Sequence, residues 1–336
     1  MMPTGLVRPS PPAPPAPNRH PGRVGPAGGP RAGGRQVRHS RTLKDTVCWQ
    51  CPASLDCEIA RMCLAHPTSA IRLAAVIRAI KAMREGLDER LSLTKLANAA
   101  MLSPFHFHRV FRHVTATTPA RYLAALRMAE AKRLLVCSQL SVTEICGAVG
   151  YASLGTFTNQ FTRLVGTSPR SFRSLMSEYG ELPVGELLAS VAALINPATD
   201  QVELAPPGLA GTVNGGPSDE SGVAMLGLFA SGVAQQRPVA CAIVSSPGLT
   251  AFGPVPDGIY QLLAISFTPA ATVAQALADH RAPVRFVGAD RRPVVVRNGG
   301  TAVNFDVTLR RPRYTDPPVV MALPLLMAAQ AGTLVK

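Results

Sequence analysis

An internal repeat in the middle of the sequence constrains the fold more than any other feature. "LTKLANAAMLSPFHFHRVFRHVTATTPARY" (93–122) aligns with "VTEICGAVGYASLGTFTNQFTRLVGTSPRSF" (142–172), with one additional residue in the turn of the second copy. In both copies apolar residues recur at helical spacing on either side of a short turn, and a serine, a good N-cap, precedes the second helical segment. Each copy therefore predicts two short helices joined by a tight turn, the helix-turn-helix pattern.

The second helix of such a motif enters the major groove of DNA, so 103–115 and 153–165 are the candidate recognition helices. We expect Phe157, Phe161 and Leu164 to pack inward. The residues expected near the outward, base-facing ends are Gly155, Thr156, Thr158 and Asn159, and in the first copy Pro104, Phe105, His108 and Arg109. The residues expected to meet phosphates are Ser103, Arg112, His113, Ser153, Arg163, Arg170 and Arg173. One such pattern alone is often only a helical hairpin, but two copies in one basic region argue against that alternative.

The charge of the chain favours a polyanionic partner. The formal charge is +14, from 34 Lys and Arg and 20 Asp and Glu, and residues 70–174 hold 15 of the basic and 5 of the acidic residues. Nucleic acid and an anionic membrane surface both fit such an excess. No apolar run reaches the roughly 18 residues of a spanning helix, and no apolar leader is present at the start. We therefore expect a cytoplasmic, nucleoid-associated protein with no membrane partner.

Residues 70–174 resemble the DNA-binding domain of the AraC/XylS family of bacterial transcription regulators. The resemblance rests on "SPFHFHRVFRHVTATTPARYLAALRMAEAKRLL" and "VTEICGAVGYASLGTFTNQFTRLVGTSPRSFR". It implies a monomeric seven-helix domain that binds double-stranded promoter DNA, with RNA polymerase as a further partner and a small-molecule effector as another candidate. The base readers that it implies are Phe105, His108, Arg109, Gly155, Thr156 and Asn159. Ala116 stands where the family usually has Gly, and Asn159 where a basic residue is common.

The composition divides the chain into six segments. They are a disordered Pro-, Gly- and Arg-rich tail (1–45), a cysteine-rich segment (46–67), the double helix-turn-helix domain (68–176), a linker (177–219), a β-rich domain (220–316) and a C-terminal tail (317–336). The predicted fold is therefore multidomain: an all-α bundle of seven helices, then a mainly antiparallel, β-sandwich-like domain. In that domain "PVPDGIYQLLAISF" (254–267) resembles the hairpin of transthyretin-like or carboxypeptidase-regulatory-like sandwiches. A ligand pocket, a dimer surface and a structural role all remain open for it.

Four cysteines are close together in "CWQCPASLDCEIARMC" (48–63), namely Cys48, Cys51, Cys57 and Cys63. Thiolates at such spacing can hold zinc or an iron–sulfur cluster. The spacing of the last three resembles the cluster-binding spacing of Rrf2-class iron–sulfur regulators. The alternative is that they are incidental thiols in a partly helical linker.

The sequence therefore predicts a sequence-specific transcription regulator that reads two successive major grooves, gated by a metal or redox site or by a ligand. A non-specific architectural DNA-binding protein is one alternative. A DNA-repair alkyltransferase is another, but it needs a reactive Pro-Cys-His-Arg segment, and Cys241 lies instead in the apolar "PVACAIV" (238–244). Hydrolase, metalloprotease, P-loop and dinucleotide motifs are not found, so we expect no enzyme.

Overall fold

The residues that the computed structural model describes lie within the unit Leu55–Lys336. The described residues are 67–195, 209–215, 222–278, 285–289, 293–298, 304–322 and 325–327. The expectations for the tail 1–45 and for Cys48, Cys51, Cys57 and Cys63 lie outside the described residues.

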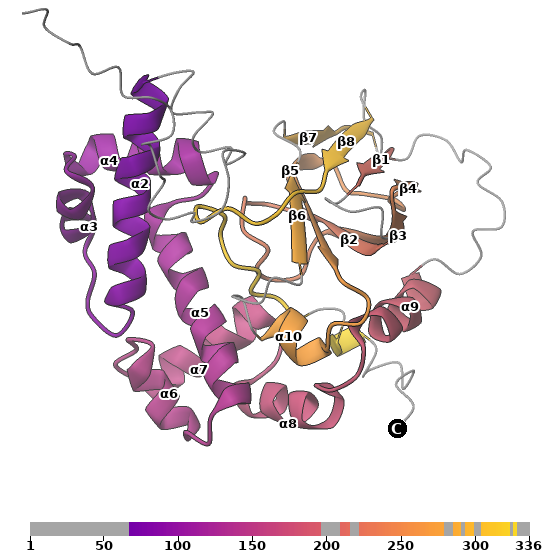
Figure 1. The fold of residues 1–336 in the computed structure, drawn as a ribbon, viewed down its shortest axis with the longest axis horizontal. Helices are drawn as coiled ribbons and strands as arrows, with labels where there is room; N and C mark the ends of the chain where they lie inside the picture. Colours follow the sequence, from indigo (N-terminus) through magenta and orange to yellow (C-terminus); the bar gives the residue numbers. More distant parts are fainter. Residues whose placement is uncertain are drawn as a thin grey trace, which may run out of the picture. The chain divides into compact units, whose positions relative to one another are not determined.

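Helices form the first part of the described chain (Figure 1). Their bounds are α2 Pro67–Glu85, α3 Leu93–Ala100, α4 Pro104–Thr115, α5 Pro119–Cys137, α6 Val142–Ala148, α7 Leu154–Val165, α8 Pro169–Tyr179 and α9 Val184–Ile195. Most begin after a hydroxyl side chain that accepts a hydrogen bond from a backbone N–H of the first turn; these caps are Ser92, Ser103, Thr118, Ser141, Ser153 and Ser168. Proline opens α4, α5 and α8, where a missing N–H leaves no helical hydrogen bond unmade.

The two copies of the repeat end their first helices in the same way. Met101 after α3 and Gly150 after α6 both adopt the left-handed backbone conformation, with φ of 59° and 76°. Their N–H groups donate to the carbonyls of Asn98 and Gly147, at 2.9 Å in both copies. The following residue donates to the carbonyl one position further back, at 3.0 Å in both copies. The additional residue of the second copy, Ala152, comes after this closure, so it lengthens only the approach to α7.

Two sheets follow in the described residues. Their strands are β1 Ala210–Asn214, β2 Gly222–Phe229, β3 Ala240–Ser246, β4 Gly248–Ala251, β5 Gly258–Phe267, β6 Arg285–Ala289, β7 Val294–Val296 and β8 Phe305–Thr308, with α10 Val273–Leu277 between β5 and β6. The smaller sheet has the order β4-β1-β8, and the larger has β3-β2-β5-β6 with β7 also paired to β5. Within the described residues the strand pairs are antiparallel except for the parallel pair β1–β8. Leu226 and Leu262 of the larger sheet share a buried cluster with Val213 and Val307 of the smaller one.

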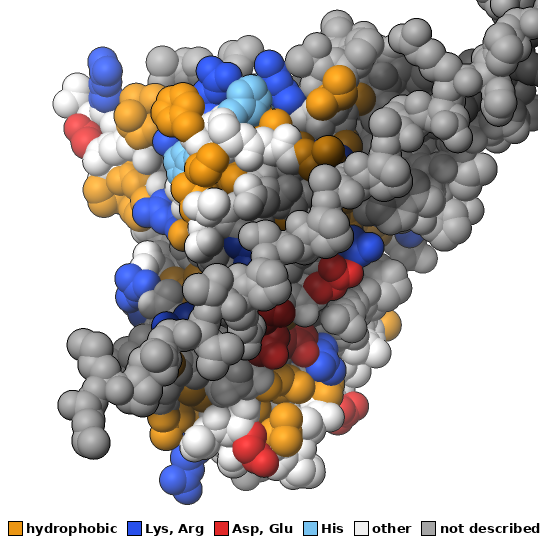
Figure 2. All heavy atoms as spheres, turned by 90° about the vertical axis from the view of Figure 1, so that its left-hand side faces the viewer, with side chains coloured by type: hydrophobic (Ala, Val, Ile, Leu, Met, Phe, Trp, Pro, Cys, Tyr) orange, Lys and Arg blue, Asp and Glu red, His pale blue; other side chains and the backbone are white. Residues whose placement is uncertain are grey.

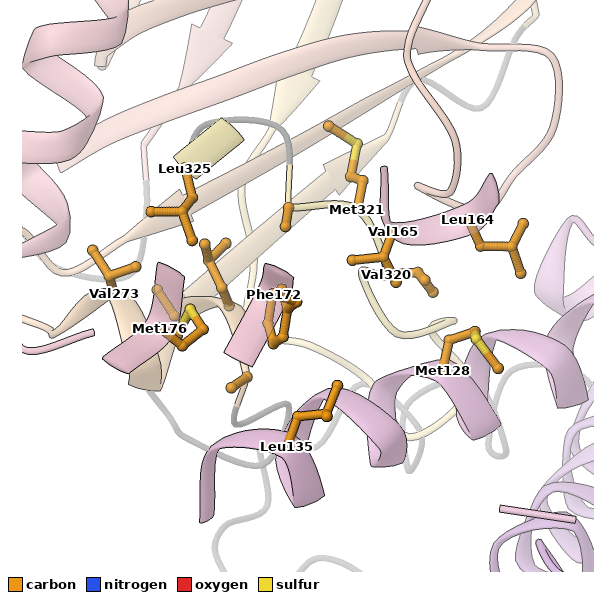
Figure 3. Close-up of a cluster of buried hydrophobic side chains, with 14 of the residues drawn as sticks. Met128, Leu135, Leu164, Val165, Phe172, Met176, Val273, Val320, Met321 and Leu325 are labelled. Carbon is orange, nitrogen blue, oxygen red and sulfur yellow. The ribbon is translucent and has the colours of Figure 1, made fainter. Parts of the chain in front are cut away.

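The second helix-turn-helix motif and the β-rich part share one hydrophobic core (Figure 3). Its members come from α5, α7, α8, α10 and the segment after β8, and include Met128, Leu135, Leu164, Phe172, Met176, Val273, Val320, Met321 and Leu325. The first motif has a separate core, formed by α2, α3, α4 and α5. The β-rich part is thus packed into one half of the helical domain.

Two segments differ from the expectation of a linker and a tail. The predicted linker 177–219 contains α9 and β1, and α9 buries Val184, Leu187 and Val191 in the shared core. The predicted tail 317–336 contributes Val320, Met321 and Leu325 to the same core. Pro- and Gly-rich stretches near these segments are typical of linkers. The apolar side chains at helical spacing in α9 instead indicate a buried helix.

Candidate nucleic-acid interface

An equivalent aromatic cluster holds each candidate recognition helix. In the first motif Phe111 lies between Phe107 and Tyr122, with ring centroids 5.4 Å apart in both pairs. In the second motif the matching rings are Phe157, Phe161 and Phe172, with separations of 5.8 and 5.9 Å. All six side chains are fully buried. Because these rings fix the inner faces of α4 and α7, the opposite faces of the two helices are exposed.

The residues predicted to face bases in α4 lie on or near its outer surface. Phe105 is 83% exposed, Arg109 is exposed and His108 is half-buried. Figure 2 shows the histidines of α4 beside Lys and Arg side chains and exposed hydrophobic ones. Met101, in the turn before α4, is 78% exposed and was missed by the sequence analysis. The sequence feature that indicates Met101 is an apolar residue at the turn position equivalent to Gly150 of the second copy.

In α7 the predicted residues Gly155, Thr156 and Asn159 are exposed. The Thr156 hydroxyl accepts a hydrogen bond from Ser153 Oγ at 2.8 Å, and the Thr156 N–H donates to the same Oγ at 3.3 Å. A Cβ added to Gly155 would meet no atom within 4 Å, so this part of the face is open. Leu154 is 43% exposed beside it and was not predicted. The N-terminal part of the outer face of α7 thus carries uncharged side chains that can form hydrogen bonds, beside the apolar Leu154.

Six of the seven predicted phosphate-contacting residues are exposed, namely Ser103, Arg112, His113, Ser153, Arg163 and Arg170. Both serines cap their helices, and free N–H groups at helix N-termini favour anions. Arg163 donates to Gln160 Oε1 at 2.7 Å on the surface of α7.

Arg173 has a different environment from the other basic residues. It is half-buried, and its guanidinium donates to the Leu135 carbonyl at 2.9 Å and to the Leu140 carbonyl at 2.6 Å. These contacts tie α8 to the end of α5. The two carbonyls lie 38 and 33 residues upstream of Arg173. The sequence around Arg173 therefore does not indicate these hydrogen bonds.

Arg127 in α5 connects the two motifs and was not singled out from the sequence. Its Nε donates to the Leu87 carbonyl at 3.0 Å and its Nη2 to the Glu89 carbonyl at 2.7 Å, both in the loop before α3. The same guanidinium lies 5.6 Å from the ring centroid of Tyr151, in the turn between α6 and α7. Burial lowers the pKa of Arg127, yet an arginine remains charged under such conditions. One side chain of the central helix therefore links the first motif to the turn of the second.

Candidate metal ligands are not grouped in the part of the chain that the structure describes. Within it, no three His, Cys, Asp or Glu side chains are grouped to hold a metal ion. Burial raises the pKa of Cys241, so this thiol is not activated as a nucleophile. Among the described helices, none combines the length and apolarity that crossing a membrane requires.

Two helix-turn-helix motifs joined by one long helix, with both recognition helices exposed on their outer faces, define a double helix-turn-helix domain. A family model described as a helix-turn-helix domain matches residues 96–174, and this region is a domain of the AraC/XylS type.

Curated relatives match the same part of the chain. It is 36% identical over 90 residues to the uncharacterized HTH-type transcriptional regulator YobQ of Bacillus subtilis, over 27% of this chain and 37% of the relative. It is 37% identical over 91 residues to the MmsAB operon regulatory protein of Pseudomonas aeruginosa, over 27% and 30% of the two chains. A match of 31% identity over 91 residues, 27% of this chain and 43% of the relative, is to the bifunctional transcriptional activator/DNA repair enzyme AdaA of Bacillus subtilis. The aligned region thus spans about a third of the length of the curated relatives.

Proposed function

We propose that this chain is a sequence-specific, DNA-binding regulator of transcription that reads two successive major grooves with α4 and α7. The observation that carries the proposal is the structural equivalence of the two motifs. Matching aromatic clusters and matching turn hydrogen bonds hold two recognition helices with their outer faces exposed. A single chain with two such helices can recognise an asymmetric site.

The side chains assigned to base edges are Phe105, His108, Arg109, Gly155, Thr156 and Asn159. Arginine suits guanine, asparagine suits adenine, and threonine can donate, accept or contact a thymine methyl group. The phosphate contacts are assigned to Ser103, Arg112, His113, Ser153, Arg163 and Arg170. Arg173 is left out of this set because its guanidinium already serves two main-chain carbonyls.

The partners included in the proposal are double-stranded promoter DNA and RNA polymerase, and the compartment is the cytoplasm. The relatives named above as a transcriptional regulator and as a transcriptional activator support this choice. The helices α2 to α8 support a seven-helix DNA-binding domain at 68–176. The cluster shared by the two sheets supports a sandwich-like arrangement of the β-rich part.

A binding selection on randomised duplex DNA, with the full chain at fixed salt, tests the proposal. We expect an enriched motif with two half-sites about 10 base pairs apart, since two recognition helices on one face of DNA are separated by about one helical turn. The enriched duplex should bind at least about a thousandfold more tightly than random duplex. Equal affinity for all duplexes would instead identify a non-specific architectural protein.

A further inference from the structure

A cavity of about 1250 Å³ lies between the larger sheet and the first helix-turn-helix motif. Its sheet side is formed by β2, β5 and β6, and its helical side by the start of α2 and the end of α4, including Thr115 and Ala116. The segment after β8 closes it with Pro317, Val319 and Met321. This volume is enough for a small organic molecule.

The lining of the cavity combines an apolar floor with a basic set of charges. Met225, Phe229 and Ile265 supply buried apolar side chains from the sheet, and Leu263 supplies a half-buried one. The charged and imidazole side chains around them are Arg72, His113, Asp306, Arg310, Arg313 and Asp316. Basic groups outnumber carboxylates in this set.

Both carboxylates of the cavity already accept hydrogen bonds from the protein. Asp316 accepts from the Arg310 guanidinium at 2.7 and 2.8 Å and from the Arg313 N–H at 2.6 Å. Asp306 accepts from Thr212 Oγ1 and Asn214 Nδ2 at 3.2 and 2.5 Å. The three arginines of the cavity exceed its two carboxylates by one positive charge, so the cavity matches a molecule with an apolar body and one negative charge.

The wall of the cavity also contacts the ends of both recognition helices. The loop between β2 and β3 contributes Gly232, which packs so closely on Ala116 after α4 that an added Cβ would lie 2.7 Å from the Ala116 carbonyl oxygen. The same loop reaches α7, where the Gln236 N–H donates to the Leu164 carbonyl at 3.0 Å. One loop thus supports the C-terminal ends of α4 and α7.

The segment after β8 strengthens this connection. The Val320 N–H donates to the Ala234 carbonyl of the loop at 3.0 Å, and the Ala322 N–H donates to the Val165 carbonyl of α7 at 3.1 Å. Ala234 and Val319 both line the cavity. A molecule that displaces the loop or this segment must act on the ends of the recognition helices.

We infer that the cavity binds a small organic anion with an apolar body, and that its occupancy changes the relative placement of α4 and α7. The binding part of this inference stands on the cavity alone. The consequence for DNA affinity rests on the function proposed above. The two parts are tested by separate measurements.

Cys241 provides a direct readout of occupancy because it lines the cavity and is half-buried, whereas Cys137 is exposed and outside it. The full chain is alkylated with N-ethylmaleimide, and the modified peptides are resolved by mass spectrometry. The probes are 4-phenylbutyrate, 4-phenylbutanol and 4-phenylbutylamine, which share an apolar body and differ in charge. We expect 4-phenylbutyrate at ten times its dissociation constant to slow alkylation of Cys241 about tenfold by mass action, with Cys137 unchanged. Equal protection by all three probes, or none by the anion, would overturn the inference.

A charge variant tests the anionic specificity. Arg72→Gln should raise the concentration of 4-phenylbutyrate that gives half-protection of Cys241, because it removes a basic side chain from the cavity. The alcohol should show no such change. Arg90→Gln removes another exposed arginine, outside the cavity, and serves as the control. A change of the same size in both variants would rule out a specific role for the cavity charge.

The coupling to DNA is measured with the enriched duplex at fixed salt. We expect 4-phenylbutyrate to change the dissociation constant for DNA at least about fivefold, the lower end of allosteric coupling. Protection of Cys241 without a change in DNA affinity would refute the coupling and leave the binding site. Protection of Cys241 in a chain for which no duplex is enriched would refute the proposed function instead.

Discussion

At the scale of single residues, the same side-chain type serves different purposes according to its exposure. Arg109 and Arg170 are exposed, whereas Arg173 is half-buried and donates to two main-chain carbonyls. An arginine that contacts DNA must be accessible to a base or a phosphate. An arginine that donates to main-chain carbonyls must remain in one position. Exposure therefore separates the candidate recognition residue Arg170 from the structural residue Arg173 within one basic run.

Arg109→Ala tests direct readout by α4. If Arg109 binds a guanine, the variant should lose about 1–3 kcal/mol of binding free energy and relax specificity at one base pair. A repeated binding selection gives the specificity, and titration at fixed salt gives the affinity. Arg90→Ala is the control with a comparably exposed arginine. A uniform loss over all duplexes would assign Arg109 to a phosphate.

Arg170→Ala and Arg173→Ala form a second test at this scale. Arg170→Ala should reduce the slope of log affinity against log salt by about one, with unchanged stability, because it loses one phosphate contact. Arg173→Ala should lower the free energy of unfolding by about 2 kcal/mol, since two carbonyls lose a charged donor. Denaturant unfolding and salt titrations separate the two effects. Equal stability of the two variants would contradict the structural role of Arg173.

At the scale of the elements, the turn inside each motif sets the geometry of its recognition helix. Met101 and Gly150 occupy equivalent left-handed positions with equivalent hydrogen bonds. Only glycine fits the second turn, because the Leu87 carbonyl and the Arg127 guanidinium lie against it. The first turn accepts methionine because its side chain extends into solvent.

Gly150→Ala should therefore destabilise the protein. Its φ is positive, and the added Cβ would lie 2.3 Å from the Leu87 carbonyl oxygen, so the backbone must shift. We expect a loss of at least about 2 kcal/mol in the free energy of unfolding. The control is Gly147→Ala, three residues earlier, whose Cβ meets no atom within 4 Å. Equal stability of the two variants would show that the turn tolerates a side chain.

Gly155→Gln tests the outer face of α7. The added side chain meets no atom within 4 Å at its Cβ, so folding should be preserved. Against a DNA groove the same side chain should obstruct contact and weaken binding about tenfold, equal to about 1.4 kcal/mol. Gly147→Gln introduces the same side chain on α6, at a position that is open as well. Unchanged DNA affinity of Gly155→Gln would place α7 outside the interface.

At the scale of the whole molecule, the segment after β8 connects both motifs to the β-rich part. The Tyr122 hydroxyl donates to the Asp316 carbonyl at 3.0 Å, and buried Lys132 donates to the Val319 carbonyl at 3.1 Å. Burial raises the pKa of Tyr122, so its hydroxyl remains a donor. Phe172, at the equivalent position of the second motif, has no hydroxyl and instead joins the shared core. The two equivalent rings therefore contact the rest of the chain by different means, Tyr122 through a hydrogen bond and Phe172 through apolar packing.

Tyr122→Phe isolates this attachment. Phe172 shows that a phenyl ring fits such a cluster, so the variant should lose only the hydrogen bond, about 1 kcal/mol of unfolding free energy. Amide exchange around Asp316 and Val320 should become faster. Tyr260→Phe is the control, since the Tyr260 hydroxyl donates to the Pro256 carbonyl within its own turn, at 3.0 Å. Faster exchange of these amides in both variants, or in neither, would contradict the attachment.

The local elements of this protein follow from the sequence by itself. Serine caps, prolines at helix starts, apolar residues at helical spacing and the repeat determine the two motifs, because each depends on neighbours a few residues away. The candidate base-facing residues follow from the same periodicity. Only the tertiary structure decided the roles of Arg127, Arg173 and the segment after β8. Their partners lie tens to hundreds of residues away in the chain, and only packing brings such groups within hydrogen-bonding distance.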